Sequence, residues 1–132
     1  MAIVNVSTTD SYVNSYLAVI RGAEYGREVR SSIASAVDRC YRLALLKAGK
    51  AYNTTTAAVI NEHLNRIRNA VFGEEVRDAI RTGIEKCYTA RNKAISTAEN
   101  NYLTSLIEAQ TAEDLLNAIL RSIALCCTEV KS

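Results

Sequence analysis

Apolar residues recur at intervals of three and four positions along most of the chain, which is the spacing of one face of an α-helix. The first such stripe consists of Tyr12, Val13, Tyr16, Leu17 and Ile20. It predicts a short helix that ends near Arg21, and the cluster of Ser7, Thr8, Thr9 and Asp10 precedes it as a typical N-cap. The chain therefore begins with a short amphipathic helix.

A second stripe follows Gly26 and predicts a longer helix. It is formed by Val29, Ile33, Val37, Cys40 and Ala44. Glu28 lies in the expected first turn, where a negative charge is favourable, and Gly49 is the expected C-terminal stop. At about 1.5 Å per residue this helix is on the order of 30 Å long, and with the first it forms a helical hairpin.

The same pattern then repeats after a cap cluster at Asn53 to Thr56. A short stripe of Val59, Ile60, His63, Leu64 and Ile67 precedes a stripe of Val76, Ile80, Ile84 and Cys87. The spacing continues through Ile95 to Ile107 without Gly or Pro, so we expect one long helix there, with Asn100 and Asn101 as the expected interruption. The chain is thus two short-helix and long-helix pairs in tandem.

The last predicted helix covers about 111–129 and is the most apolar segment. Thr111 and Asp114 resemble a capping box at its start. Its candidate interface residues are Leu116, Ile119, Leu120 and Ile123. A helix with so broad an apolar face must be buried inside the fold or against another subunit.

The two helix pairs are copies of one unit, because Leu17–Tyr41 recurs 47 residues later (72 − 25) as Leu64–Tyr88. Eleven positions are identical: Leu17/Leu64, Ile20/Ile67, Arg21/Arg68, Ala23/Ala70, Gly26/Gly73, Glu28/Glu75, Val29/Val76, Arg30/Arg77, Ile33/Ile80, Cys40/Cys87 and Tyr41/Tyr88. A looser echo leaves a third copy open, since Ala118, Ile119, Ile123 and Cys126 match Ala79, Ile80, Ile84 and Cys87.

Composition supports an all-α fold in one domain. The chain has 132 residues, 48% of them hydrophobic and 23% charged, and it contains no proline. This is the range of a single domain with a buried core. We expect a helical bundle over residues 1–132, with repeat 1 at about 8–50, repeat 2 at about 55–100, and the hydrophobic C-terminal helix closing it.

The net charge of +2 is too small for a strong nucleic-acid footprint, but the charges are unevenly distributed. Repeat 1 is basic, with Arg21, Arg27, Arg30, Arg39, Arg42, Lys47 and Lys50 against Glu24, Glu28 and Asp38. From Asn101 onward, four acidic residues stand against Arg121 and Lys131. Such polarity suits head-to-tail contact between copies, and a solvated face explains it equally well.

The chain has no charged and apolar leader at its start and no apolar run long enough to span a membrane. We therefore expect a protein made in the cytoplasm that has no membrane partner.

No catalytic, cofactor or metal site is predicted. The four cysteines lack metal-ligand spacing, and only one histidine is present. Cys40 and Cys87 fall on apolar stripes, so we expect reduced core residues there instead of a disulfide or zinc. His63 takes the place of Tyr16 in the repeat and is expected to pack against the core. No nucleophile and base can be assembled, which predicts a non-enzymatic protein.

The polar residues of the duplicated segment are interpreted as structural. Arg21 and Arg68 lie at a predicted helix end, and Glu28 and Glu75 at the next helix start, so each pair could form an ion pair across the turn. Gly26 and Gly73 are expected to provide a positive φ or a close helix approach. An anion site at these helix starts is the weaker alternative.

The duplicated segment also resembles a known helical module. Residues 67–80, IRNAVFGEEVRDAI, followed by Gly83, Ile84 and Glu85, are similar to the "IRNAxYGxxVRxAIxxGIE" segment of tail, baseplate and fibre-associated structural proteins of tailed bacteriophages. The first copy, residues 20–30, is similar too, apart from Gly22 and Glu24. The two copies cover about half of the chain, and no β-rich or Gly-rich extension follows them.

The resemblance implies a helical module that docks a protein into a tail assembly as a multimer. The docking residues that match the motif are Arg21, Tyr25, Gly26, Glu28, Val29, Arg30, Ile33, Arg68, Phe72, Gly73, Glu75, Val76, Arg77 and Ile80. We expect a structural or adaptor subunit of a virion, assembled in the host cytoplasm, with itself and other virion proteins as partners. The alternative is a helical nucleic-acid-associated protein, such as a filament coat or packaging factor, that contacts phosphates through basic repeat 1.

Overall fold

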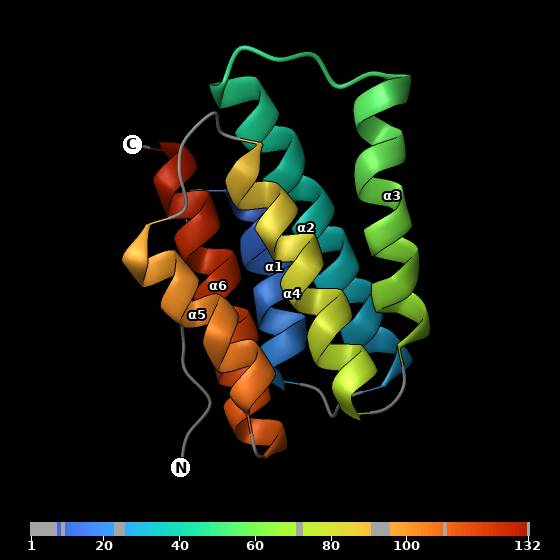
Figure 1. The fold of residues 1–132 in the computed structure, drawn as a ribbon, viewed down its shortest axis with the longest axis vertical. Helices are drawn as coiled ribbons and strands as arrows, with labels where there is room; N and C mark the ends of the chain where they lie inside the picture. Colours follow the sequence, from blue (N-terminus) through green and yellow to red (C-terminus); the bar gives the residue numbers. More distant parts are fainter. Residues whose placement is uncertain are drawn as a thin grey trace.

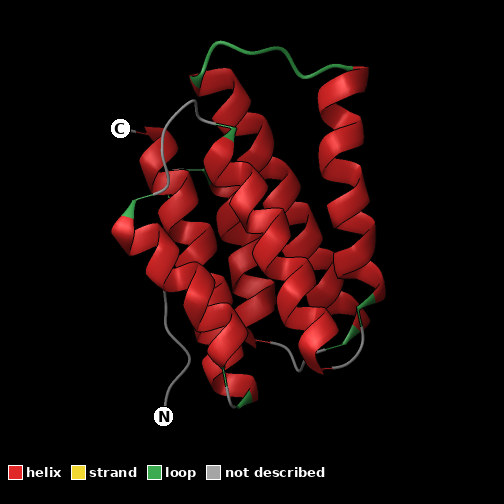
Figure 2. Cartoon of the chain, viewed as in Figure 1, coloured by secondary structure: helices red, strands yellow, loops and turns green. Residues whose placement is uncertain are grey.

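A computed structural model describes residues 8, 10–22, 26–70, 73–90, 96–109 and 111–131. Within these ranges it describes all side chains except those of residues 73, 74, 112, 113 and 125–131. In the described part the regular elements are helices, with no strand (Figure 2). The predicted all-α class is confirmed.

Six helices run through the described residues. They are α1 (Ser11–Gly22), α2 (Arg27–Lys47), α3 (Thr54–Asn69), α4 (Gly73–Thr89), α5 (Thr97–Glu108) and α6 (Ala112–Lys131). Helices α1 and α2 have the expected short and long lengths of 12 and 21 residues. Helices α3 and α4 have 16 and 17 residues, so the prediction of a short and a long helix is wrong for the second pair.

Polar side chains cap the helix starts where the sequence placed cap residues. Asp10 Oδ2 accepts a hydrogen bond of 2.9 Å from the backbone N–H of Val13 at the start of α1. Asn53 and Thr56 form a reciprocal capping box on α3. Thr111 accepts from the N–H of Asp114 at 3.0 Å, which begins α6 as predicted. These side chains satisfy N–H groups that have no partner within the helix.

The end of α2 is set by Gly49, as expected. Its φ of 73° lies in the left-handed region that side chains disfavour. The N–H of Gly49 donates to the carbonyl of Leu46 at 3.1 Å, and the N–H of Lys50 donates to that of Leu45 at 2.8 Å. This pair of bonds is the Schellman arrangement, which reverses the chain after a helix.

The prediction that α4 continues through Ile95 to Ile107 is wrong. Helix α4 ends at Thr89, a new helix begins at Thr97, and Asn100 and Asn101 lie inside it. The N–H of Ser96 donates to Glu99 at 2.9 Å, while Ser96 accepts from the N–H of Glu99 at 3.1 Å. This capping box was readable in the sequence, but the apolar spacing continues across the break and masks it.

The helices form an inner group and an outer group. Helices α2, α4 and α6 contact one another, and each outer helix contacts two of them: α1 packs on α2 and α6, α3 on α2 and α4, and α5 on α4 and α6 (Figure 1). Each outer helix therefore packs against the inner helix of its own hairpin and against the inner helix of the preceding hairpin. For the first hairpin the preceding one is the third, because α1 packs on α6. The C-terminal helix is the inner helix of a third hairpin, and not a cap closing two.

One hydrophobic core joins side chains from all six helices. Every apolar position shared by the two copies is buried where the structure describes both side chains: Leu17/Leu64, Ile20/Ile67, Val29/Val76, Ile33/Ile80, Cys40/Cys87 and Tyr41/Tyr88. The repeat thus encodes the inward face of each hairpin, whose burial provides most of the stabilisation of the bundle.

The third hairpin follows the same pattern at a spacing of 39 residues (103 − 64). Leu103, Leu106 and Ala109 on and after α5 are buried, as are Leu64, Ile67 and Ala70. On α6, Ala118, Ile119 and Ile123 are buried, as are Ala79, Ile80 and Ile84 on α4. The spacing is shorter because α4 and α5 have 17 and 12 residues, against 21 and 16 in α2 and α3, so the third hairpin matches the first two only loosely in the sequence.

Two sulfur contacts repeat the same geometry between neighbouring inner helices. Cys87 Sγ on α4 lies 3.3 Å from the carbonyl oxygen of Val37 on α2, and Cys40 Sγ on α2 lies 4.0 Å from that of Ile123 on α6. Val37 and Ile123 are equivalent positions in the repeat. Successive inner helices therefore pack in similar registers.

Candidate functional site

The two copies of the motif meet at one end of the bundle, where α1 leads into α2 and α3 leads into α4 (Figure 1). Arg30 Nε, on α2, donates a hydrogen bond of 3.0 Å to the carbonyl oxygen of Arg68 at the end of α3. Arg30 belongs to the first copy and Arg68 to the second, so one contact joins them. We call this shared end the repeat corner and define it by residues 21–33 and 68–80.

The apolar docking candidates of the repeat corner belong to the core. Val29, Ile33, Val76 and Ile80 are no more than 3% exposed. A side chain so buried cannot contact a partner without unfolding the hairpin. These four residues hold the helices together, and only the polar motif residues remain for docking.

The charged candidates lie on the surface but do not pair as expected. Arg21, Glu28, Arg68 and Glu75 are exposed. Among the described residues no ion pair joins Arg21 to Glu28 or Arg68 to Glu75, so that expectation is wrong. Helix ends in water do not require a partner for each charge, and the cost of ordering two long side chains offsets most of the gain from pairing.

The structure describes only some of the turn residues of the motif. Gly26 is the N-cap of α2 with φ −177°, an extended conformation, so a positive φ is not needed there. Gly73 is the first residue of α4. Tyr25 and Phe72 lie outside the described residues. Arg77, the equivalent of Arg30, is half-buried, and its Nε has no hydrogen-bond partner within the described part of the chain.

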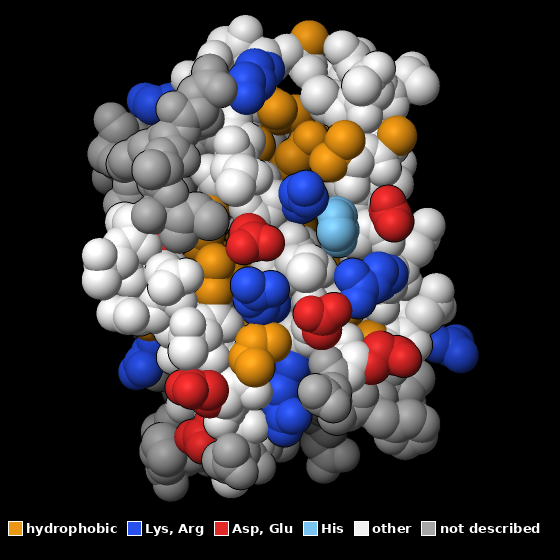
Figure 3. Space-filling model, in the orientation of Figure 1, with side chains coloured by type: hydrophobic (Ala, Val, Ile, Leu, Met, Phe, Trp, Pro, Cys, Tyr) orange, Lys and Arg blue, Asp and Glu red, His pale blue; other side chains and the backbone are white. Residues whose placement is uncertain are grey.

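A hollow of about 370 Å³ opens beside the second copy of the motif. It is lined by Asn65, Arg66 and Asn69 of α3 and by Glu75 of α4. Farther along the same two helices Arg66 pairs with Asp78 at 2.8 Å, and Arg81 lies 3.8 Å from Glu85. Basic and acidic side chains therefore alternate over this face around the single histidine (Figure 3), which makes it a solvated ion-pair face.

The C-terminal candidate interface is not exposed. Leu116 is 9% exposed, and Ile119, Leu120 and Ile123 are at most 1% exposed. From the sequence, the apolar face of this helix could be buried either within the fold or against another subunit. In the structure α6 packs on α1, α2, α4 and α5, so this face is buried within the fold. These four residues offer no surface to a partner.

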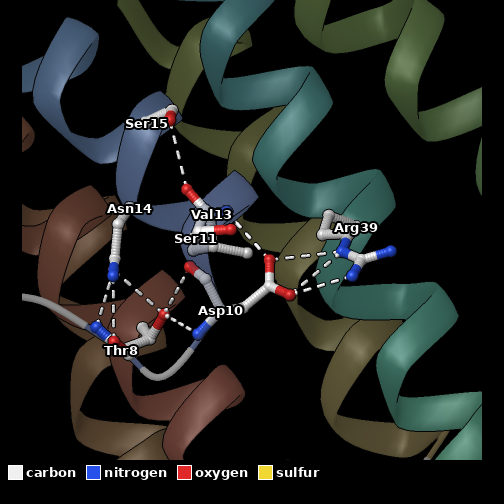
Figure 4. A network of polar contacts seen from close by, with 7 residues as sticks. All are labelled: Thr8, Asp10, Ser11, Val13, Asn14, Ser15 and Arg39. Atoms are coloured by element: carbon white, nitrogen blue, oxygen red, sulfur yellow. Dashed lines mark hydrogen bonds and ion pairs between the residues drawn. The ribbon is translucent and has the colours of Figure 1, made fainter.

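A second polar site, missed at the sequence level, joins the start of α1 to α2. Asp10 caps α1 and also accepts a hydrogen bond of 2.9 Å from Arg39 Nη2, with further contacts to Arg39 Nε at 3.2 and 3.3 Å (Figure 4). The Arg39 guanidinium lies 4.8 Å from the centre of the Tyr12 ring. One carboxylate thus caps a helix and holds an arginine against an aromatic face.

The ionisation of this pair follows from its contacts. The hydrogen bond from Arg39 is the main cause that lowers the pKa of Asp10, with a smaller contribution from the N–H of Val13. The same hydrogen bond raises the pKa of Arg39. Both groups are therefore charged near neutral pH.

A second arginine and tyrosine pair follows one turn farther along α2. Arg42 Nε donates to Asp38 Oδ2 at 3.1 Å, and the guanidinium stacks 3.9 Å from the centre of the Tyr52 ring. Arg42 Nη2 also contacts the Tyr52 hydroxyl at 3.1 Å. The other oxygen of Asp38, Oδ1, is buried without a hydrogen-bond partner in the described part of the structure.

These groups surround a hollow of about 320 Å³ between α1, α2 and the end of α3. We call it the arginine surface, formed by Tyr12, Tyr16, Asp38, Arg39, Arg42 and Arg68. The excess of basic residues in repeat 1 hinted at it, but the hollow exists only because Arg68, from the other copy, is brought beside α2.

The expectation for the cysteines is half right. Cys40 and Cys87 are both 1% exposed, and Cys87 is a free thiol. Cys40, however, is disulfide-bonded, which corrects the prediction of two reduced residues. The spacing of the cysteines could not reveal this bond, because a disulfide requires two cysteines that tertiary packing brings close together, and sequence spacing alone does not show which ones these are.

His63 packs as expected against neighbouring helices. Its ring is half-buried, and burial is the main cause that lowers its pKa, followed by repulsion from Lys86. Within the described residues there is no group of three or more His, Cys, Asp or Glu side chains that could hold a metal ion. No helix in the described part is long and apolar enough to cross a membrane.

Comparison with known proteins adds no relative to this picture. No family model matches the chain, and no curated protein or solved structure is detectably similar to it. The functional argument therefore rests on the residues and on their geometry.

Proposed function

We propose that this chain is a non-enzymatic structural or adaptor subunit of a phage virion or phage-like tail. It acts by helix-mediated docking and by oligomerisation. The resemblance of the duplicated segment to the docking module of tail-associated proteins suggests this role. A bundle whose helices share one hydrophobic core is a suitable rigid module for it.

The repeat corner is the observation that carries the proposal. The two copies of the motif lie side by side, linked by Arg30 and Arg68, and they present their exposed charges at the same end of the bundle. A neighbouring protein could engage both copies at once through Arg21, Glu28, Arg68 and Glu75. Two linked contacts bind more tightly than either contact alone.

The disulfide at Cys40 is consistent with a virion as the final location. Disulfides persist in oxidising surroundings and are rare in proteins that stay in the reducing cytosol. A subunit assembled in the cytoplasm and then released in a particle ends in such surroundings.

The test is whether the chain is part of a particle. Phage or tail-like particles from cells that carry the gene would be purified, analysed by mass spectrometry and labelled with gold-coupled antibodies against this chain. We expect the chain in a fixed amount per particle, with label at one position. Absence from purified particles, together with a monomer that joins no assembly, would contradict the proposal.

A nucleic-acid-associated role is the second candidate, favoured by the arginine surface. Stacked arginines beside tyrosines are found where proteins hold single strands. Against it, Asp10 and Asp38 already pair with Arg39 and Arg42, and a phosphate would meet their negative charge. Fluorescence anisotropy with labelled single- and double-stranded DNA at low salt decides this: the candidate requires binding that weakens steeply as salt is added.

A further inference from the structure

The molecule carries a second charged hollow, on the third hairpin. Its volume is about 290 Å³, and we call it the acidic surface, lined by Tyr102, Ser105, Glu108, Asp114 and Arg121. It lies where α5 ends and α6 begins, whereas the arginine surface lies on α1, α2 and the end of α3. The two hollows are therefore built from different helices.

The lining of each surface has a majority charge and one residue of the opposite sign. The arginine surface is lined by three arginines and Asp38, and Arg39 also pairs with Asp10. The acidic surface holds two carboxylates, Glu108 and Asp114, and Arg121. If the two surfaces faced each other, the carboxylates could approach the arginines while Arg121 approached Asp38. The pattern is complementary in both its majority and its minority charges.

Asp38 gives this pattern a specific requirement. Its Oδ1 is buried without a hydrogen-bond partner among the described residues, and an unpaired buried acceptor is unfavourable. Because this oxygen is covered by the fold, a partner can meet only the exposed part of Asp38, a quarter of its side-chain surface, and the negative charge there favours a cation such as the guanidinium of Arg121.

An aromatic side chain belongs to each surface, Tyr12 to the arginine surface and Tyr102 to the acidic surface. Tyr12 is 61% exposed. Aromatic and aliphatic side chains ringed by charges are common at protein interfaces, where they provide most of the binding energy.

We propose that two copies of this chain associate head to tail, with the arginine surface of one copy bound to the acidic surface of the next. The proposal specifies the oligomerisation in the proposed function and rests on it. Because the two surfaces differ, the contact is heterologous, so it can build rings or open filaments and is not restricted to a two-fold dimer.

Two single charge reversals test the contact, one on each surface. Arg68→Glu changes an exposed side chain on the arginine surface, and Asp114→Lys changes the acidic surface. Sedimentation velocity without reductant, at about 50 mM salt and over a range of protein concentrations, gives the apparent dissociation constant. We expect wild-type protein to self-associate and each variant alone to do so at least tenfold more weakly, because like charges then face each other.

Mixing the variants is the decisive step. The Arg68→Glu copy retains Asp114, and the Asp114→Lys copy retains Arg68, so the mixture contains matched surfaces and should associate although neither variant does so alone. Association should also weaken when the salt is raised to about 500 mM, because the interacting charges are near solvent.

Matched controls make the same charge reversals at exposed positions elsewhere on the bundle. Lys47→Glu serves as the control for Arg68→Glu, and Glu62→Lys for Asp114→Lys, because neither Lys47 nor Glu62 lines the arginine surface, the acidic surface or the repeat corner. Both controls should associate like wild-type protein. Circular dichroism of all four variants checks that the fold is kept.

Three results would overturn the proposal. These are a wild-type chain that stays monomeric at every concentration, a mixture that remains dissociated, and controls that weaken association as much as the test variants do. Binding of single-stranded DNA that Arg68→Glu abolishes, without self-association, would assign the arginine surface to nucleic acid instead. In each case the presence of the chain in particles remains a separate measurement, so failure of this contact and failure of the proposed function are distinguishable.

Discussion

The hairpins α1–α2 and α3–α4 have nearly the same core but different surfaces. Their identical apolar residues are buried in both copies wherever the structure describes both side chains. The outer groups differ: Tyr12, Arg39 and Arg42 in the first hairpin correspond to Val59, Lys86 and Thr89 in the second. The duplicated core provides the same scaffold twice. The copies differ in surface side chains outside this core, and those of the first copy form most of the arginine surface.

If the two hairpins share one core, equivalent core residues should contribute equally to the free energy of unfolding. Ile33 and Ile80 are both fully buried. Replacement of either by alanine should destabilise the fold by about 2–5 kcal/mol, because it removes buried methyl groups and leaves a cavity. Urea unfolding followed by circular dichroism measures both variants. A loss in one copy several times that in the other would show that the two hairpins do not share the core equally.

The cysteines differ between the copies, since Cys40 is disulfide-bonded and Cys87 is a reduced thiol. Reductant should lower the stability of the wild-type protein by roughly 2–4 kcal/mol, because the cross-link no longer restricts the unfolded chain. Thermal unfolding with and without reductant measures the loss. Cys40→Ala should no longer respond to reductant, whereas Cys87→Ala should respond fully; an equal response from both variants would contradict this assignment.

The helix caps differ in how far they reach. Asp10 caps α1 and also binds Arg39 of α2, whereas Asn53 caps α3 within its own turn. Asp10→Ala and Asn53→Ala should each cost about 0.5–2 kcal/mol, with the larger loss for Asp10.

Only the Asp10 contribution should depend on pH. The pKa of Asp10 is lowered in the fold, so its stabilisation is complete above the ordinary value of 3.8 and is lost as the pH falls through that value towards the folded one. Urea midpoints at several pH values between about 2 and 6 measure this effect. Asn53→Ala should shift the midpoint by a constant amount, and an equal slope in Asp10→Ala and wild-type protein would refute the role of the pair.

The smallest expected effect comes from the position where Tyr16 in one copy corresponds to His63 in the other. The pKa of His63 is lowered, so the unfolded chain binds a proton more readily, and stability falls as the pH drops below the ordinary value of 6.5. Because the ring is half-buried, the effect should be well under about 1 kcal/mol between pH 7.5 and 5.

Charges around His63 act in both directions. Lys86 and Arg66 lower the pKa, while Glu62 and Glu85 raise it. His63→Tyr copies the first repeat and should remove this pH dependence without loss of the fold. Urea midpoints at about pH 5 and 7.5 provide the check, with wild-type protein as the control. A variant that keeps the same pH dependence would show that another group is responsible.

Much of this architecture follows from the sequence alone. Apolar spacing and cap residues determine α1, α2 and α3 closely, and the starts of α4 and α6 as well, because these signals act within one or two turns. The repeat identified the inward positions of both copies before any packing was known. The break between α4 and α5 was missed, since apolar spacing alone cannot show whether a helix continues or a new one begins in the same phase.

Only the tertiary structure decided how the hairpins combine. Burial of the α6 face within the chain, the bond at Cys40 and the juxtaposition of Arg30 with Arg68 all depend on which helices pack together. The arginine surface likewise required Arg68 of one copy to lie beside α2 of the other. The spacing of apolar residues along one helix predicts which side chains point inward. Which helix each of these side chains contacts depends on the packing of the whole bundle.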